Sequence, residues 1–265
     1  MFRSRSRRRA ERDRLRRVLR LHSAISHGDP DTIAFVCNEI AGDRIYDSHG
    51  IHIGPGDTVI DGGGNFGIAA VYFASVCGAA RVLTFEPVPP TFAALERNIA
   101  PHAACTGFHE GLWSHACERE MTHYPQAAAM SSLFADPERD RAYIESTMLA
   151  MGLAADEAAD RARGFFAETQ TFRCSFRSVS DVLRDEGIER VDLLKIDVEG
   201  AEREVLAGIH EDDWPRIRQI VLEAHDDAHL PELEGALRAH GMHTETAQDA
   251  LMAETPMRLV YGVRP

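Results

Sequence analysis

The stretch from Thr58 to Gly67, TVIDGGGNFG, constrains the fold of this chain more than any other. Val59 and Ile60 are successive β-branched apolar residues, which is typical of a central parallel strand buried on both faces. Asp61 and the glycines after it end that strand abruptly, and apolar residues at helical spacing follow from Ile68. The pattern predicts a strand, a tight turn and a helix, with bare backbone at the turn where a ligand can approach.

The spacing of the glycines indicates a nucleoside-containing ligand. Gly62, Gly64 and Gly67 fit GxGxxG, and Glu86 lies 19 residues beyond Gly67. A carboxylate directly before the first glycine, at Asp61, would repel a pyrophosphate and attract a ligand that carries an amine and a sulfonium. S-adenosylmethionine is such a ligand. The sequence therefore favours a site for S-adenosylmethionine over one for a nicotinamide dinucleotide.

The segment Arg81 to Pro87, RVLTFEP, supports this interpretation. Its apolar residues predict the next strand, and Glu86 at the strand end can accept two hydrogen bonds from a ribose diol. Together with the Asp-Gly turn, this strand resembles the first two cofactor motifs of class I methyltransferases.

Length and cysteine content fit one α/β domain with an insertion, because 265 residues would be cramped as two domains. The longest nearly apolar run, 68–80, is 13 residues, whereas a membrane span needs roughly 20. No CxxC pair occurs, which argues against a disulfide framework and a thiolate zinc site. We therefore expect a cytoplasmic protein without membrane contact. The five scattered cysteines are Cys37, Cys77, Cys105, Cys117 and Cys174.

Charge is distributed unevenly. Residues 1–20 hold ten arginines and only two acidic residues, whereas the remaining chain carries 19 basic and 40 acidic side chains. An acidic body repels nucleic-acid phosphates, so nucleic acid is an improbable partner for it. We expect residues 1–30 to form a flexible, solvated tail and residues 31–265 to form the folded domain.

Predicted strands and helices alternate, which indicates a doubly wound, mostly parallel sheet whose closing strand pair forms an antiparallel edge. Similarity to class I methyltransferases implies a Rossmann-like sheet of seven strands. The predicted strands cover 58–61, 82–85, 106–113, 120–124, 171–176, 191–198, 218–224, 242–246 and 257–263. The predicted helices cover 68–77, 91–100, 179–186, 200–208 and 230–240.

Residues 127–170 interrupt this alternation. They are rich in alanine and charged residues, and they predict two or three helices with a break at Met151 and Gly152. A periodic insertion of this length could close over the cofactor as a substrate lid, or could simply pack on the surface.

Acidic residues and one histidine follow four predicted strands. In open α/β sheets, ligands bind outside the carboxyl ends of the strands, so these side chains are the candidate site residues. Glu199 also has a structural interpretation, since a carboxylate favours the N-terminus of a following helix. The candidates are Asp61, Glu86, Asp197 with Glu199, and Glu223 with His225.

Several segments together resemble the FkbM family of S-adenosylmethionine-dependent methyltransferases, over about Ile40 to Tyr261. They are DGGGNFG, the FEP at 85–87, VDLLKIDVEGAEREVLAG at 191–208 and VLEAHD at 221–226. The segment 125–136, with the run SSLFADP that begins at Ser131, resembles members that O-methylate polyketide and peptide natural products. Family members commonly have valine at the position of Gly62 and alanine at that of Gly64.

The resemblance implies a role for each candidate. Glu86 would hold the ribose, and Asp197 would face the methyl group or the methionine amine. His225 would accept the proton of a hydroxyl, with Glu199 and Glu223 on the substrate side. The methionine part would lie on Asp61, Gly62, Gly64, Asn65 and Gly67, and the adenine on Glu110, Gly111 and Leu112.

These roles imply direct in-line methyl transfer to a hydroxyl of a secondary metabolite, without a metal ion. Alternatives stay open. The acceptor could be a sugar hydroxyl or a nitrogen, the protein could bind S-adenosylmethionine without catalysis, or it could be a nicotinamide oxidoreductase. The oligomeric state is open as well.

Overall fold

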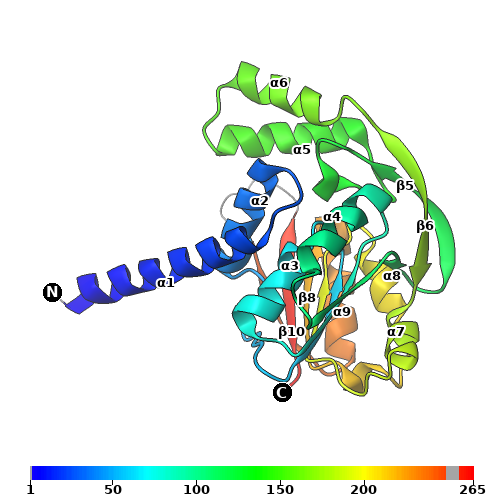
Figure 1. Cartoon of the computed structure of the whole chain (residues 1–265). Coiled ribbons are helices and arrows are strands. Elements are labelled where there is room, and N and C mark those ends of the chain that lie inside the picture. The colour runs from blue at the N-terminus through cyan, green and yellow to red at the C-terminus, as the bar shows by residue number, and fades with distance from the viewer. Residues whose placement is uncertain (1, 249–256) are drawn as a thin grey trace.

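A computed structural model describes residues 2–248 and 257–265 of the chain (Figure 1). Seven strands form the main sheet in the order β3-β2-β1-β7-β8-β10-β9. The first five in this order run parallel, and β10 and β9 are antiparallel to their neighbours. The predicted seven-stranded, mostly parallel sheet with an antiparallel edge is therefore confirmed. The strands are β1 (Thr58–Gly62), β2 (Arg81–Phe85), β3 (Cys105–Phe108), β7 (Leu193–Ile196), β8 (Gln219–Ala224), β9 (His243–Ala247) and β10 (Arg258–Val263).

Helices cover both faces of this sheet, and the alternation of side chains along β1 shows why. Val59 packs with α3 and α4, whereas its neighbour Ile60 packs with α7, α8 and α9. Both side chains are fully buried, and burial of each stabilises the fold by roughly 1.5–3 kcal/mol. The helices on the two faces are α3 (Ile68–Tyr72), continued as a π-helix η2 (Phe73–Cys77), α4 (Pro89–Ile99), α7 (Val179–Asp185), α8 (Glu202–Ala207) and α9 (Leu230–Ala239), with short turns η4 (Trp214–Arg216) and η5 (Asp227–His229).

A second sheet of three strands was not predicted. The predicted strand 106–113 divides into β3 and β4 (Gly111–Leu112), and only β3 joins the main sheet. β5 (Cys117–His123) and β6 (Gln170–Arg177) pair antiparallel along their length, with β4 beside β6. The predicted strands at 120–124 and 171–176 are thus partners of each other, because the insertion between them returns the chain.

The insertion forms a short turn η3 (Ala128–Met130) and two helices, α5 (Pro137–Ala150) and α6 (Ala155–Phe165). Asp136 caps α5 by accepting hydrogen bonds from two backbone amides. Gly152 has a φ of 91°, a left-handed conformation that suits glycine at the predicted break. The two helices lie side by side beyond α2 (Figure 1).

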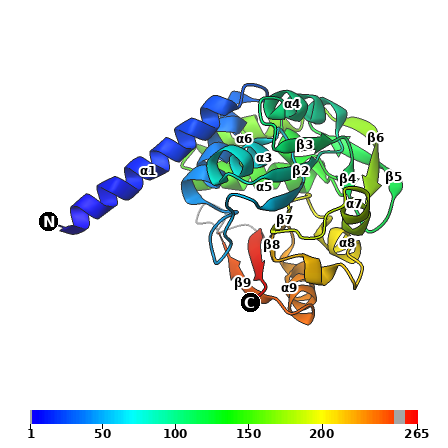
Figure 2. The same cartoon turned by 60° about the horizontal axis from the view of Figure 1, so that its bottom comes forward.

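The N-terminal segment, predicted as a flexible, solvated tail, is helical and is anchored to the domain at its C-terminal end. Residues 2–24 form helix α1 (Phe2–Ala24), which projects from the domain at its N-terminal end (Figure 2). At the other end, Leu21 and Ile25 are buried in the core, and Asn98 accepts hydrogen bonds from the amides of Ser26 and His27. Arginine and leucine favour helix, and this apolar anchor docks it. α2 (Pro30–Cys37) and the π-helical η1 (Asn38–Asp43) follow.

None of the helices within 2–248 and 257–265 combines the length and the apolar character that crossing a membrane demands.

Candidate active site

A pocket lies at the carboxyl ends of β1, β2 and β7. It is lined by the glycine turn after β1, by the exits of β2 and β7, by helices α2 and η1 with Tyr46 after them, and by the insertion with the second sheet. The pocket therefore joins the predicted cofactor motifs to the segment predicted as a substrate lid.

The glycine turn is held close against β2 and β7. The amides of Gly63 and Gly64 both donate to the carbonyl of Phe85, at 3.1 and 2.8 Å. Gly63 has a φ of 77°, and a Cβ there would lie 1.6 Å from the carbonyl oxygen of Asp197. Only glycine fits this position. Gly63 was not among the predicted site residues, although it lines the pocket.

Among the predicted turn residues, Gly64 and Asn65 line the pocket, whereas Gly62 and Gly67 have structural roles. Gly67 begins α3 in a left-handed conformation with a φ of 80°. A Cβ on Gly62 would lie 2.9 Å from Leu112. One on Gly64 would lie 2.3 Å from the Thr84 hydroxyl. The space that valine and alanine fill in the family is thus taken by neighbouring side chains here.

Lys195 connects the turn to the exit of β7. Its Nζ donates to the carbonyls of Gly62 and Gly63 at 3.1 and 2.8 Å. It also forms ion pairs with Asp61 Oδ1 at 3.1 Å and Asp197 Oδ2 at 3.4 Å. Burial alone would lower the pKa of Lys195, but the two carboxylates outweigh burial and raise it. The side chain is only 2% exposed, so this ammonium is a permanent charge within the protein.

Asp61, predicted to hold the methionine part of the cofactor, is not among the residues that line the pocket. Its side chain is fully buried, and Oδ2 accepts a hydrogen bond from the Thr84 hydroxyl at 2.8 Å. Within the chain, the cation beside Asp61 is Lys195.

Asp197 is the strand-end aspartate on the pocket wall. Its side chain is 24% exposed, and Oδ2 accepts a hydrogen bond from the Tyr46 hydroxyl at 3.0 Å. Burial would raise the pKa of Asp197, but the nearby cations Lys195 and His225 and these hydrogen bonds lower it. Asp197 therefore presents a stable negative charge to the pocket.

Glu86 lines the pocket on the other side of the turn. One carboxylate oxygen accepts a hydrogen bond from the Asn65 amide and the other from the Val88 amide, both at 2.9 Å. Each oxygen keeps a second lone pair, which suits a ribose diol. Burial raises the pKa of Glu86 to about 7.

Of the three residues predicted to bind adenine, two line the pocket and one does not. Gly111 and Leu112 line the pocket beside Met121 and Phe176, which offer an apolar surface. Glu110 does not line it and instead forms an ion pair with Arg177 at 3.6 Å.

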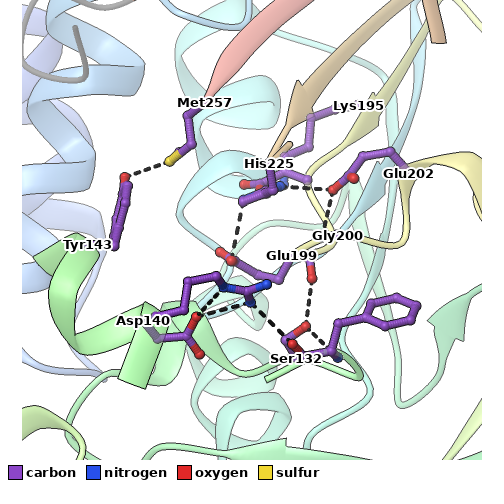
Figure 3. Close-up of polar contacts among 12 residues, drawn as sticks. Ser132, Asp140, Tyr143, Lys195, Glu199, Gly200, Glu202, His225 and Met257 are labelled. Atoms are coloured by element: carbon purple, nitrogen blue, oxygen red, sulfur yellow. Dashed lines mark hydrogen bonds and ion pairs between the residues drawn. The ribbon is translucent and has the colours of Figure 1, made fainter. Parts of the chain in front are cut away.

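His225 lies between two carboxylates at the end of β8 (Figure 3). Nδ1 is 2.9 Å from Glu202 Oε1, and Nε2 is 3.3 Å from Glu199 Oε2. Burial would lower the pKa of His225, but the two carboxylates raise it well above its usual value. Of this group only Glu199 lines the pocket. These surroundings argue against His225 as the direct proton acceptor.

Glu223, predicted on the substrate side, does not line the pocket either. Burial, together with neighbouring carboxylates, raises the pKa of Glu223 well above its usual value.

The backbone at Glu199 links the site to the insertion. Glu199 has a left-handed φ of 53°, and its carbonyl accepts a hydrogen bond from the Ser132 hydroxyl at 2.6 Å (Figure 3). Glu202, the first residue of α8, accepts a hydrogen bond from the Gly200 amide at 2.9 Å.

Asp197, Glu199 and His225 also offer ligand atoms within 4.8 Å of one another, as a divalent cation would require. Each already has partners in the chain. Asp197 accepts a hydrogen bond from Tyr46 and forms an ion pair with Lys195, and Glu199 pairs with His225. The expectation that no metal takes part stays a prediction.

Besides Gly63, the predicted site residues did not include Tyr46, Ser132, Lys195 and Glu202, which lie on or near the pocket. A signal existed for Lys195, because a charged residue in the middle of VDLLKIDV needs a buried partner. Tyr46 lies outside every motif.

Comparison with known proteins agrees with these motifs. Residues 61–243 match the methyltransferase FkbM domain family. The chain is 36% identical over 245 residues to the 31-O-demethyl-FK506 methyltransferase FkbM of Streptomyces tacrolimicus, covering 91% of this chain and 94% of that protein. It is 33% identical over 219 residues to methyltransferase sdnD of Sordaria araneosa, covering 78% and 81%.

The crystal structure of a methyltransferase FkbM from Methylobacillus flagellatus superposes on this chain with a TM-score of 0.53 at 12% identity. It covers 93% of this chain and 58% of that one. This structural likeness shows the fold alone, whereas the sequence matches show the family. The chain belongs to the FkbM methyltransferase family.

Proposed function

We propose that the protein transfers a methyl group from S-adenosylmethionine to a hydroxyl of a small secondary metabolite. One observation carries the proposal: Asp197 and Glu86 line one pocket on either side of a glycine turn that leaves the backbone bare. The Asp197 carboxylate suits the methionine ammonium, the Glu86 carboxylate suits the ribose diol, and the apolar surface beside them suits the adenine.

Different residues would bind the three parts of the cofactor. Asp197 would hold the methionine amine, Glu86 the ribose hydroxyls, and the surface of Leu112, Met121 and Phe176 the adenine. When bound, the cofactor supplies an electrophilic methyl group on its sulfonium. The main contribution of the protein is then to align the acceptor hydroxyl with that methyl group.

The acceptor side of the pocket favours an apolar molecule. Val36 and Ile40 come from the N-terminal helices, and Ala128, Ala129 and Leu133 come from the insertion. A sugar would need polar partners for its hydroxyls, and this wall offers few of them. The name of the Streptomyces tacrolimicus relative, which acts on 31-O-demethyl-FK506, supports the same class of acceptor. A sugar hydroxyl is the second candidate.

The insertion, residues 127–170, would serve as the acceptor lid. Support comes from its contribution to the pocket lining and from the bond between Ser132 and the Glu199 carbonyl. The small side chains at Ala128 and Ala129 leave room for the acceptor.

Binding should be tested first, by titrating the protein calorimetrically with S-adenosylhomocysteine and, separately, with NADH. We expect saturable binding of S-adenosylhomocysteine that Glu86→Ala weakens, and no binding of NADH. Glu245→Gln is the matched control, because Glu245 is an exposed glutamate that pairs with His49. Preference for NADH would refute the cofactor assignment.

Methyl transfer to 31-O-demethyl-FK506, and to a panel of macrolactone and peptide alcohols, would then be followed by mass spectrometry. Binding of S-adenosylhomocysteine without transfer to any of these alcohols would favour a non-catalytic binding protein or a different acceptor class.

A further inference from the structure

Three side chains form a row from the pocket wall into the protein interior: Glu199, His225 and Glu202 (Figure 3). Their exposure falls along the row, from 26% for Glu199 through 16% for His225 to 3% for Glu202. Only the first of them lines the pocket. An acceptor hydroxyl in the pocket therefore meets Glu199 before it can meet the imidazole.

The inner end of the row is fixed. Glu202 Oε1 accepts from His225 Nδ1 and from the Gly200 amide, both at 2.9 Å. A buried carboxylate with two donors holds the imidazole in one orientation, as the third group of a catalytic triad does. His225 Nε2 then points to Glu199 at 3.3 Å.

The protonation states follow from this geometry. An imidazole with a carboxylate on each nitrogen is held as a cation, because each proton has an acceptor. As a cation it has no lone pair for another proton. Glu199 keeps its charge beside this cation, while burial raises the pKa of Glu199 above its usual value, toward that of an effective base.

We propose that Glu199 is the catalytic base of the methyl transfer, and that His225 and Glu202 are positioning residues behind it. This inference rests on the function proposed above. As the acceptor oxygen bonds to the methyl carbon, the bond from that carbon to sulfur breaks. The hydroxyl proton moves to a carboxylate oxygen of Glu199 and later leaves to solvent.

Groups on several elements face Glu199 and determine how it titrates. The one cation among these groups is His225. The remaining groups are three carboxyl groups and one phenol, namely Asp197 after β7, Glu202 on α8, Glu223 on β8 and Tyr143 on α5. The Ser132 hydroxyl holds the Glu199 backbone, so the insertion also fixes the position of the base.

Glu199→Gln is the central test, with methylation of 31-O-demethyl-FK506 or the first alcohol of the panel that the wild type accepts. We expect kcat to fall by ~10²–10⁴, while the Kd for S-adenosylhomocysteine stays within about twofold. The acidic limb of the pH profile of kcat should disappear. Formate should partly restore the activity of Glu199→Ala, which a purely structural role of Glu199 would not allow.

The positioning residues should behave differently. His225→Gln and Glu202→Gln should reduce kcat about tenfold and retain the acidic limb. In His225→Gln this limb should move to higher pH, because loss of the imidazolium raises the pKa of Glu199. Glu245→Gln removes a carboxylate from the exposed pair with His49 and should change neither rate nor profile.

Two results would overturn the proposal. In the first, Glu199→Gln keeps kcat within threefold and His225→Gln loses the acidic limb, which would make His225 the base. In the second, a chelator abolishes activity and Mn²⁺ restores it, which would make the row part of a metal site. A wild type that methylates no alcohol refutes the proposed function, and this inference with it.

Discussion

The ends of β1 and β7 differ, although both carry an aspartate paired with the same lysine. Asp61 is fully buried between Lys195 and Thr84, whereas Asp197 is 24% exposed and faces the pocket. The first aspartate stabilises the site from within, and the second presents its charge to a ligand. A carboxylate at a strand end therefore marks the ligand edge of the sheet but does not by itself show which carboxylate contacts the ligand.

Removal of the shared cation should have the largest effect. Lys195→Met leaves Asp61 buried without a counter-ion, and loss of one partner of a buried pair costs about 3–5 kcal/mol. Urea unfolding should show this loss in the free energy of unfolding. The double variant Lys195→Met with Asp61→Asn should recover part of it. A loss below about 1 kcal/mol would mean that Asp61 reaches water, contrary to its burial.

Glu86 provides the next test, through pH. Its folded-state pKa of about 7 exceeds the ordinary value of 4.5. The folded state therefore binds this proton more tightly, and stability falls as pH rises from 4.5 through 7. The difference corresponds to about 3 kcal/mol. Glu86→Gln should lack this component, so its free energy of unfolding relative to the wild type should increase between pH 5 and 8. Parallel curves would contradict the raised pKa.

Asp197→Asn and Asp61→Asn should separate the two strand ends directly. Asp197→Asn should raise the Kd for S-adenosylhomocysteine at least tenfold, about 1.4 kcal/mol, because it removes the charge that faces the ligand. Asp61→Asn should instead lower the melting temperature and leave this Kd within about threefold. Calorimetric titration and thermal unfolding measure both, and the reverse pattern would exchange the roles of the two aspartates.

The smallest effect concerns the insertion, whose Ser132 bonds the segment that follows β7. Ser132→Ala removes the hydrogen bond to the Glu199 carbonyl and should cost about 1 kcal/mol of stability. Its KM for the acceptor should rise more than its Kd for S-adenosylhomocysteine. Ser23→Ala is the matched control, since that serine bonds a carbonyl on exposed helix α1. Equal losses in the two variants would show that Ser132 does not position the site.

The sequence predicted the sheet well because each main strand carries its own signal. Val59 and Ile60 identify β1. Asp197 and Glu223 lie at the ends of buried apolar runs, and the alternation of strands and helices then predicts that both lie near the same edge of the parallel sheet. Pairing between strands has no such local signal. Asp61 and Lys195 are direct neighbours in the register of β1 and β7, but their separation in sequence hides this contact.

The same limit explains the other differences. The strands that became β5 and β6 were recognised, but their pairing in a separate sheet was not, because periodicity does not name a partner. The ten arginines of residues 1–20 indicate a solvated segment, and the burial of Leu21 and Ile25, which docks its far end, depends on contacts distant in sequence. Residue type and position after a strand favour His225 as the base, whereas its place behind Glu199 depends on side-chain packing that only the structure shows.

The contacts of Lys195 have a consequence for chemical labelling. It is the single lysine of the chain, and every other basic side chain is arginine or histidine. With its ammonium enclosed by two carbonyls and two carboxylates, it should not react with acylating reagents while the domain is folded. The extent of acylation at Lys195 would then measure the fraction of molecules that have unfolded. The protein therefore carries a reporter of its own unfolding at the centre of its candidate active site.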